Sequence, residues 1–141
     1  MQQTVTSESA MKALGEKIGA ALQGGEVIEL IGDVGAGKTT LAKGIARGLG
    51  VDDEVQSPSF TLSRVYEGSR KILLAHYDFY RLTDPGILAD ELADTMQQSD
   101  TVTVIEWAGI VDGVLPHDHV TVTIVSPSER ERQVTIRGIE L

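Results

Sequence analysis

A glycine-rich loop followed by a lysine and two threonines is the part of the sequence best suited to chemistry. Residues 32–40 read GDVGAGKTT and match the pattern G-x-x-x-x-G-K-[ST] at Gly32, Gly37, Lys38 and Thr39. In such a loop, backbone N–H groups surround a phosphate and the following helix adds the positive end of its dipole. The lysine reaches the β- and γ-phosphates, and the threonine hydroxyl binds Mg²⁺. We therefore predict a nucleotide phosphate site; the alternative is a turn that only caps a helix.

An acidic residue at the end of a neighbouring strand would complete such a site. Residues 101–105 form an apolar run that leads directly into Glu106. P-loop enzymes hold their metal with a second acidic group, usually Asp, so we predict that Glu106 binds Mg²⁺ directly or through water. The alternative is a solvated and inert carboxylate. Trp107, the only tryptophan, either packs in the core or at its rim, or covers the nucleotide or a partner.

The run HYDFYR at residues 76–81 brings a second carboxylate close to a histidine. Because side chains alternate along a strand, His76, Asp78 and Tyr80 should share one face and Arg81 should point to the other. Asp78 is a candidate to orient or deprotonate an attacking water, or to hold a metal-bound water. His76 fits a structural role as well as a functional one.

A loop rich in hydroxyl groups, QSPSFTL, occupies residues 56–62. Pro58 fixes an extended entry, and Ser57, Ser59 and Thr61 supply the hydroxyls. In GTPases and related proteins a loop at this place senses the γ-phosphate and orders around Mg²⁺. The segment reads equally well as an ordinary Ser/Pro loop.

Helices and strands that alternate along the chain must position these groups. Hydrophobic spacing and turn residues predict helices at 7–22, from the glycine-rich loop to about 49, and from Asp84-Pro85 to about 96. They predict strands at 27–31, 60–66, 71–77 and 101–105, and a hairpin around the turn 126–131. The third helix should bury Ile87, Leu88, Leu92 and Met96. The fold class is α/β, a P-loop NTPase-like three-layer fold whose mixed parallel and antiparallel sheet is flanked by helices.

Composition and charge limit the classes of function. The 141 residues fit one domain, 1–141, and contain no cysteine. The net charge of −9, from 12 basic and 21 acidic residues, argues against a protein that clamps a nucleic acid by itself. A protein partner that carries the nucleic acid fits this charge. We expect a cytoplasmic protein with no membrane contact, since no membrane-length apolar run or signal peptide is present.

Four motifs in fixed order carry a resemblance to a known family. The segments GDVGAGKTT, SPSFTL, HYDFYRL and VIEWAG together resemble the TsaE (YjeE) family, P-loop ATPases of bacterial tRNA threonylcarbamoyladenosine (t6A) synthesis. The resemblance implies an ATPase, weak alone, that works with the TsaB and TsaD proteins. That assembly transfers a threonylcarbamoyl group to adenosine 37 of tRNAs that read ANN codons. The chemistry belongs to TsaD, so this chain would act as a nucleotide-driven switch or reset and meet tRNA only indirectly.

The resemblance also assigns roles to residues. It implies a Mg²⁺ site at Thr39 and Glu106, and activity that depends on Asp78 and Trp107, with Trp107 beside the nucleotide. The catalytic set is then Asp78, Lys38 and Glu106. The ATP phosphates would lie on Gly35, Ala36, Gly37, Lys38, Thr39 and Thr40.

Three positions depart from the family pattern. Ser59 replaces a common threonine, and Ala108-Gly109 replaces a common Pro-Glu, which removes a carboxylate. Met11 stands where the family often has a threonine near the base. A basic residue of the last hairpin, Arg130 or Arg132, could approach the base instead.

Two rival functions share the loop. A small-molecule kinase needs an acceptor pocket and usually an arginine-rich lid, and residues 82–100 contain no Arg or Lys. A nucleotide-gated binding module with negligible turnover needs neither. Phosphate release, measured with and without TsaB and TsaD, separates these functions from the ATPase.

Overall fold

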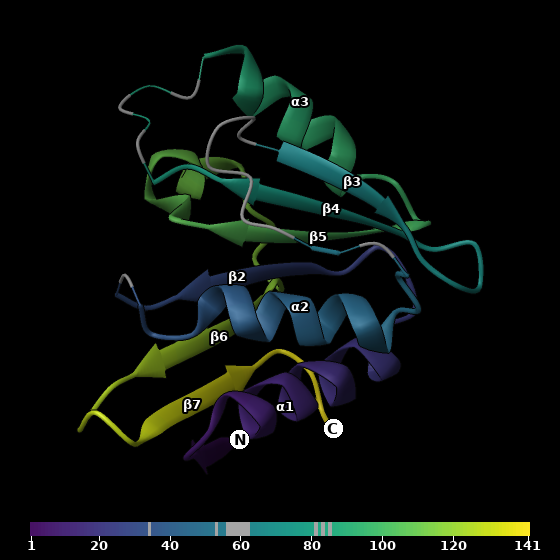
Figure 1. Ribbon diagram of the computed structural model, residues 1–141. Helices are drawn as coiled ribbons and strands as arrows, with labels where there is room; N and C mark the ends of the chain where they lie inside the picture. The colour runs from purple at the N-terminus through teal and green to yellow at the C-terminus, as the bar shows by residue number, and fades with distance from the viewer. Residues whose placement is uncertain (34, 53, 56–62, 81, 83, 85) are drawn as a thin grey trace.

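A seven-stranded mixed sheet organises the molecule. The computed structural model describes residues 1–141 except 34, 53, 56–62, 81, 83 and 85. The strands lie in the order β1-β7-β6-β2-β5-β4-β3 (Figure 1). Their bounds are β1 Gln2–Val5, β2 Val27–Ile31, β3 Ser63–Glu67, β4 Leu73–Asp78, β5 Thr101–Glu106, β6 Val120–Val125 and β7 Arg132–Arg137. The α-helices are α1 Glu8–Ala21, α2 Lys38–Gly48 and α3 Ile87–Met96, and a 3₁₀ helix, η1, spans Ala108–Val114.

The centre of the sheet is parallel and its two sides are antiparallel. Strands β4, β5, β2 and β6 pair in parallel, whereas β3 pairs antiparallel with β4, and β7 antiparallel with β6 and β1. All four parallel strands therefore end at one edge of the sheet, the edge at which α/β proteins bind their ligands. In Figure 1 this edge lies at the left.

Helices cover both faces of the sheet. Adjacent residues of β4 belong to different cores: Leu74 packs with α1 and α2, and Ala75 packs with α3 and η1. Because neighbouring side chains of a strand point to opposite faces, the two cores lie on opposite sides of the sheet. The predicted three-layer α/β fold is confirmed.

Glycines bring α1 and α2 into direct backbone contact. A Cβ atom at Gly15 would lie 2.5 Å from the Leu41 carbonyl oxygen, and one at Gly44 would lie 2.2 Å from that of Lys12. Any side chain at these positions would push the helices apart. The close packing fixes the position of α2 relative to α1.

The structure corrects several predicted elements. The third helix begins at Ile87 rather than at Asp84, and Ile87 is 84% exposed, so its predicted burial is wrong. Leu92, on the same predicted face, is fully buried. The strand expected at 60–66 is described as Ser63–Glu67, and its first three residues lie outside the described part. Strand β1 and helix η1 were not predicted.

The other predicted elements are confirmed with small shifts in their ends. Ser7 caps α1 by accepting a hydrogen bond from the Ala10 N–H at 3.0 Å. The C-terminal hairpin forms as β6 and β7. No helix in the described ranges is long and apolar enough to cross a membrane.

Candidate nucleotide-phosphate site

The glycine-rich loop connects β2 to α2 and holds two glycines in conformations that side chains resist. Gly35 has φ +80° and Gly37 has φ +111°, both in the left-handed region. The Ala36 N–H donates to the Asp33 carbonyl at 3.0 Å and closes the turn. Gly37 is the N-cap of α2 and offers no side chain to cap it. The first N–H groups of the helix therefore point into the loop without an intrahelical acceptor.

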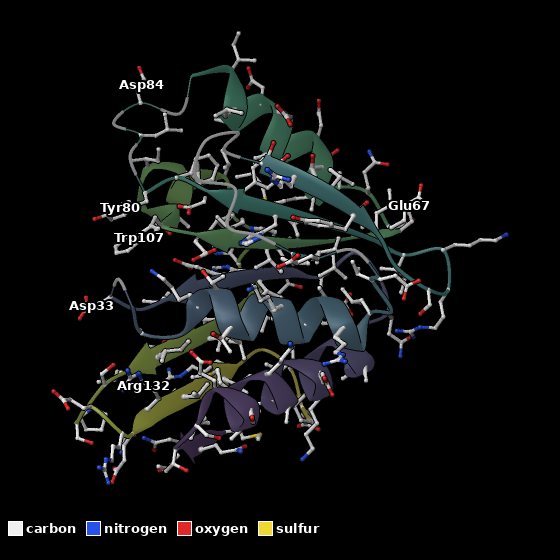
Figure 2. All side chains as sticks on the ribbon, in the orientation of Figure 1. Asp33, Glu67, Tyr80, Asp84, Trp107 and Arg132 are labelled. Carbon is white, nitrogen blue, oxygen red and sulfur yellow. The ribbon has the colours of Figure 1, made fainter. Side chains whose placement is uncertain are left out.

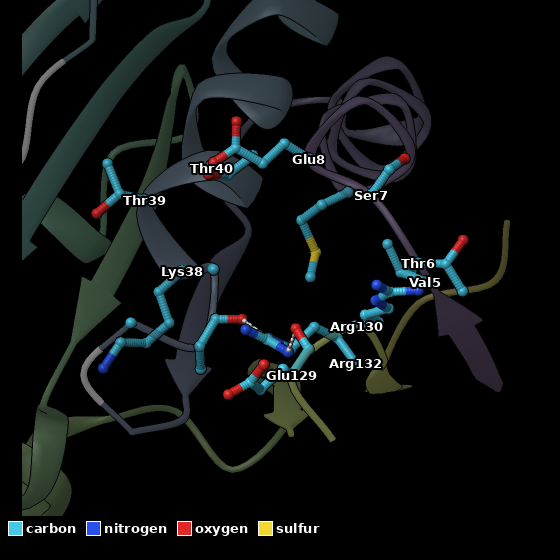
Figure 3. Close-up of a pocket in the computed structure, with 14 residues that line it drawn as sticks. Val5, Thr6, Ser7, Glu8, Lys38, Thr39, Thr40, Glu129, Arg130 and Arg132 are labelled. Atoms are coloured by element: carbon cyan, nitrogen blue, oxygen red, sulfur yellow. Dashed lines mark hydrogen bonds between the residues drawn. The ribbon is translucent and has the colours of Figure 1, made fainter. Parts of the chain in front are cut away.

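A cavity of about 530 Å³ opens beside this loop (Figure 3). Three parts of the chain line it: the loop with the start of α2, the segment that joins β1 to α1, and the turn between β6 and β7. The lining residues are Val5, Thr6, Ser7, Glu8, Met11, Gly35, Ala36, Gly37, Lys38, Thr39, Thr40, Glu129, Arg130 and Arg132. All six predicted cradle residues are among them, and so are Met11 and both arginines of the last hairpin.

Arg132 ties the β6–β7 turn to the glycine-rich loop. Its Nε donates to the Ala36 carbonyl at 3.2 Å, the contact drawn in Figure 3. One terminal nitrogen donates to the carbonyls of Ser128, Glu129 and Glu131 at 3.0 to 3.2 Å. Arg132 thus holds two walls of the cavity together, whereas Arg130 is exposed at its rim.

Lys38 lies between a carbonyl and an aromatic ring. Its Nζ donates to the Gly32 carbonyl at 2.6 Å and sits 3.6 Å from the centroid of the Trp107 ring, within cation–π range. Burial lowers the pKa of Lys38, and the charges of Glu106, Asp78 and Asp33 oppose this shift. The structure therefore brings the predicted lysine, tryptophan and carboxylates to one place.

Trp107 has an unusual backbone. Its φ of 57° and ψ of 51° are left-handed, and it is the residue that caps η1; this conformation is rare for a bulky side chain. Its ring lies 4.7 Å from that of Tyr80, centroid to centroid. Figure 2 shows Tyr80, Trp107 and Asp33 at the edge where the parallel strands end.

Asp78 and Glu106 are buried neighbours at the ends of β4 and β5. The parallel register pairs them directly, and their exposed fractions are only 7% and 3%. The Asp78 carboxylate accepts the Tyr80 N–H at 2.9 Å. Glu106 is therefore not the solvated carboxylate of the alternative reading. Two buried carboxylates and a lysine form a compact charged group beside the loop.

His76 contacts Glu106, which the sequence analysis did not foresee. Its Nε2 lies 2.7 Å from Glu106 Oε2, and its side chain is buried. The alternation of β4 correctly predicted that His76 shares a face with Asp78. The contact with Glu106 depends on the register between β4 and β5, which no local pattern reveals.

The oxygen ligands fit Mg²⁺ bound together with a nucleotide. The described residues contain no group of three or more His, Asp or Glu side chains that would hold an ion alone. Mg²⁺ usually takes one or two protein ligands and completes its shell with phosphates and water. A buried Glu106 and a hydroxyl at Thr39, in the first turn of α2, suit that pattern.

Two predicted groups lie outside the described residues. They are the hydroxyl-rich loop 56–62 and Arg81. Their predicted roles stay predictions. Ala108, which replaces the family's proline, is buried, and Gly109 is exposed.

Fold and loop together define an α/β protein of the P-loop class. A family model described as "Threonylcarbamoyl adenosine biosynthesis protein TsaE" matches residues 5–134. The chain belongs to the TsaE family.

Relatives and a solved structure agree with this assignment. The chain is 35% identical over 136 residues to the Bacillus subtilis tRNA threonylcarbamoyladenosine biosynthesis protein TsaE, covering 96% of this chain and 84% of that one. It is 38% identical over 122 residues to the Treponema pallidum protein of the same name, covering 86% and 89%. A crystal structure of YdiB from Bacillus subtilis superposes with a TM-score of 0.79 and 32% identity, over 96% of this chain and 83% of that one.

Proposed function

We propose that this protein is a Mg²⁺-dependent ATPase that serves t6A modification of tRNA. One observation carries the proposal: the uncapped start of α2 and Lys38 line the cavity, and the charges of two buried carboxylates, Asp78 and Glu106, act on Lys38. The positive potential at the start of α2 favours phosphate binding. The two carboxylates are suited to bind a metal ion and to hold a water molecule. Arg132 and Met11 line the part of the cavity that extends beyond the loop, where a base and ribose have room.

Each residue has a role in hydrolysis. Lys38 leaves the Gly32 carbonyl and the Trp107 ring to neutralise the β- and γ-phosphates. Thr39 and Glu106 hold Mg²⁺, which supplies charge stabilisation for the transferred phosphoryl group. Asp78 orients the attacking water or accepts its proton. Trp107, which contacts Lys38 in the structure, would lie beside the bound nucleotide.

The named relatives support the biological role. They are described as tRNA threonylcarbamoyladenosine biosynthesis proteins, and we infer that this chain takes part in the same modification of adenosine 37. TsaB and TsaD are its proposed partners, with ATP hydrolysis as the switch or reset of their complex. A net charge of −9 supports indirect rather than direct contact with tRNA. The cytoplasm, where tRNA is modified, is the proposed location.

A small-molecule kinase is the rival that shares this site. A kinase lid contributes arginines that cover the transferred phosphoryl group. Residues 82–100 contain no Arg or Lys, and the described helix in this segment, α3, carries three acidic residues: Asp90, Glu91 and Asp94. Hydrolysis is therefore favoured over transfer to a metabolite.

Phosphate release is the test of the proposal. We expect slow Mg²⁺-dependent release by the protein alone and faster release with TsaB and TsaD. Lys38→Ala should abolish both, whereas Lys43→Ala, on the same helix but outside the cavity lining, should not. Binding of ATP without turnover, with or without the partners, would instead indicate the nucleotide-gated binding module.

A further inference from the structure

His76 is the buried polar side chain near the site to which the proposed ATPase gives no role. It is 1% exposed and lies on β4, two residues before Asp78. On a strand, Leu74, His76 and Asp78 share the face that packs against α2. Glu106 is the register partner of Asp78 on β5. The imidazole therefore reaches diagonally to the neighbouring strand, a common cross-strand contact.

The hydrogen bond fixes the proton of the ring on one nitrogen. A carboxylate in the ionised form that binds a cation only accepts hydrogen bonds, so with Glu106 in that form Nε2 donates to Glu106 Oε2 across the 2.7 Å contact. Nδ1 is buried and has no hydrogen-bond partner among the described residues. A proton on Nδ1 would therefore have no acceptor there, and the Nε2–H tautomer is the favoured neutral form.

The contact also decides how the Glu106 carboxylate can turn. With Oε2 held by His76, rotation of the carboxylate about its bond is restricted and Oε1 becomes the oxygen available to a cation. Groups that hold a ligating side chain in this way orient it, and their loss typically weakens metal binding. A buried carboxylate without such a partner would be free to turn toward Lys38, whose charge acts on it.

A second histidine–glutamate pair in the same chain shows a different arrangement. His119 Nε2 lies 2.9 Å from Glu29 Oε1, and its Nδ1 lies 2.6 Å from the Pro116 carbonyl. Nδ1 thus stabilises the turn before β6, and Nε2 ties that turn to β2. Neither His119 nor Glu29 lines the cavity, so this pair is a matched control for a pair that only supports the fold.

We propose that His76 is a positioning residue that holds Glu106 for Mg²⁺ in the nucleotide complex. The inference rests on the proposed function, because it assigns Glu106 to the metal. His76 itself touches neither the ion nor the nucleotide in this assignment. It acts only through Oε2 of Glu106.

The test compares His76→Gln, which keeps a donor at the position of Nε2, with His76→Leu, which removes it. The fluorescence of Trp107, the only tryptophan and the neighbour of Glu106, reports ADP binding at increasing Mg²⁺. We expect His76→Leu to raise the Mg²⁺ concentration needed for half-maximal ADP binding by roughly 10–100-fold. His76→Gln should raise it by less than about threefold. ADP binding without Mg²⁺ should stay near the wild-type value in both. His119→Leu and His119→Gln should leave the Mg²⁺ dependence unchanged.

The results distinguish the role of His76 from the proposed function on which it rests. If ADP binding by the wild type does not depend on Mg²⁺, both the proposed function and the inference are contradicted. A normal wild-type response with an unchanged His76→Leu variant, or with His76→Gln as impaired as His76→Leu, overturns the role of His76 alone. If the leucine variant does not fold, His76→Asn, whose amide is too short to reach Oε2, takes its place with the same expected loss.

The tautomer gives a readout that needs neither metal nor nucleotide. Long-range ¹H–¹⁵N spectra of the metal-free protein, assigned with the His76→Gln and His119→Gln variants, should show the Nε2–H form of His76. A predominant Nδ1–H form would contradict the hydrogen bond on which the positioning role depends.

Discussion

Lys38 shows how a buried lysine is held close to the phosphates that it is proposed to bind. Its two contacts, with the Gly32 carbonyl and the Trp107 ring, keep a buried ammonium solvated by protein atoms. An unpaired buried charge would otherwise be costly. Phosphate oxygens would replace both contacts with stronger, charge-assisted ones, so the lysine is already near the place where its charge is needed.

Asp78 carries a residue-scale prediction. Asp78→Asn keeps an oxygen that can accept the Tyr80 N–H and keeps the size of the side chain, but it removes the negative charge and the proton acceptor. We expect ATP turnover to fall by roughly 100-fold or more, with the affinity for ADP little changed. Single-turnover phosphate release and Trp107 fluorescence measure the two effects.

The control for Asp78 is an acidic residue between β4 and α3. Asp84→Asn alters an exposed carboxylate that accepts the Gly86 N–H, so the turnover of this variant should match that of the wild type. Normal turnover in Asp78→Asn would remove this residue from the catalytic set.

At the scale of elements, the turn between β6 and β7 depends on Arg132. Its guanidinium reaches the Ala36 carbonyl and three carbonyls of the turn, a spread that a lysine ammonium cannot cover. Arg132→Lys should lower the free energy of unfolding by about 1–2 kcal/mol. It should also raise KM for ATP by up to about tenfold, the equivalent of about 1.4 kcal/mol, because two cavity walls separate.

The neighbouring arginine supplies the comparison for Arg132. Arg130→Lys changes an exposed side chain at the rim of the cavity and should leave stability unchanged. Urea unfolding and ATP kinetics measure the stability and the KM of the two variants, Arg132→Lys and Arg130→Lys. Equal stability for both would show that the contacts of Arg132 carry no net free energy.

Elements also show which parts of the site the sequence predicts. The glycine-rich loop is local, so its pattern predicted the loop and the start of α2 directly. Strand alternation placed His76 and Asp78 on one face. The His76–Glu106 and Arg132–Ala36 contacts join residues 30 and 96 positions apart, and only the tertiary register defines them.

The error at Ile87 has a similar cause. Periodicity identifies the apolar face of a helix, but it does not show how far along the helix the neighbouring layer extends. Leu92, in the middle of α3, packs in the core that α3 and η1 form with the sheet. Ile87 is the first residue of α3 and is exposed to solvent.

For the whole molecule, His119 links stability to pH. Burial alone would lower its pKa, but the hydrogen bonds to the Pro116 carbonyl and Glu29, with the charges of Glu29 and Asp112, raise it above the ordinary 6.5. The folded state therefore binds a proton more tightly than the unfolded state. The contribution of His119 to the free energy of unfolding is complete below pH 6.5. It is lost as the pH rises through the pKa of His119 in the folded state.

A comparison of two proteins over a pH series tests this link. The free energy of unfolding of the wild type should fall from pH 6 to pH 8 relative to that of His119→Gln, which cannot be protonated. Taking the difference removes the titration of all other groups. Parallel curves for the two proteins would show that His119 has the same pKa in the folded and unfolded states.

The cavity joins segments from both ends of the described chain. Its walls come from residues 5–8, from the loop and α2 at 35–40, and from residues 129–132, while β1 and β7 pair at the edge of the sheet. Residues 129–132 come last of these walls in the sequence, so the complete cavity forms only once the β6–β7 hairpin has folded. Once the cavity has formed, a bound nucleotide would contact the segments next to β1 and β7 together. It would therefore slow the local opening of these strands and the exchange of their amide hydrogens with solvent.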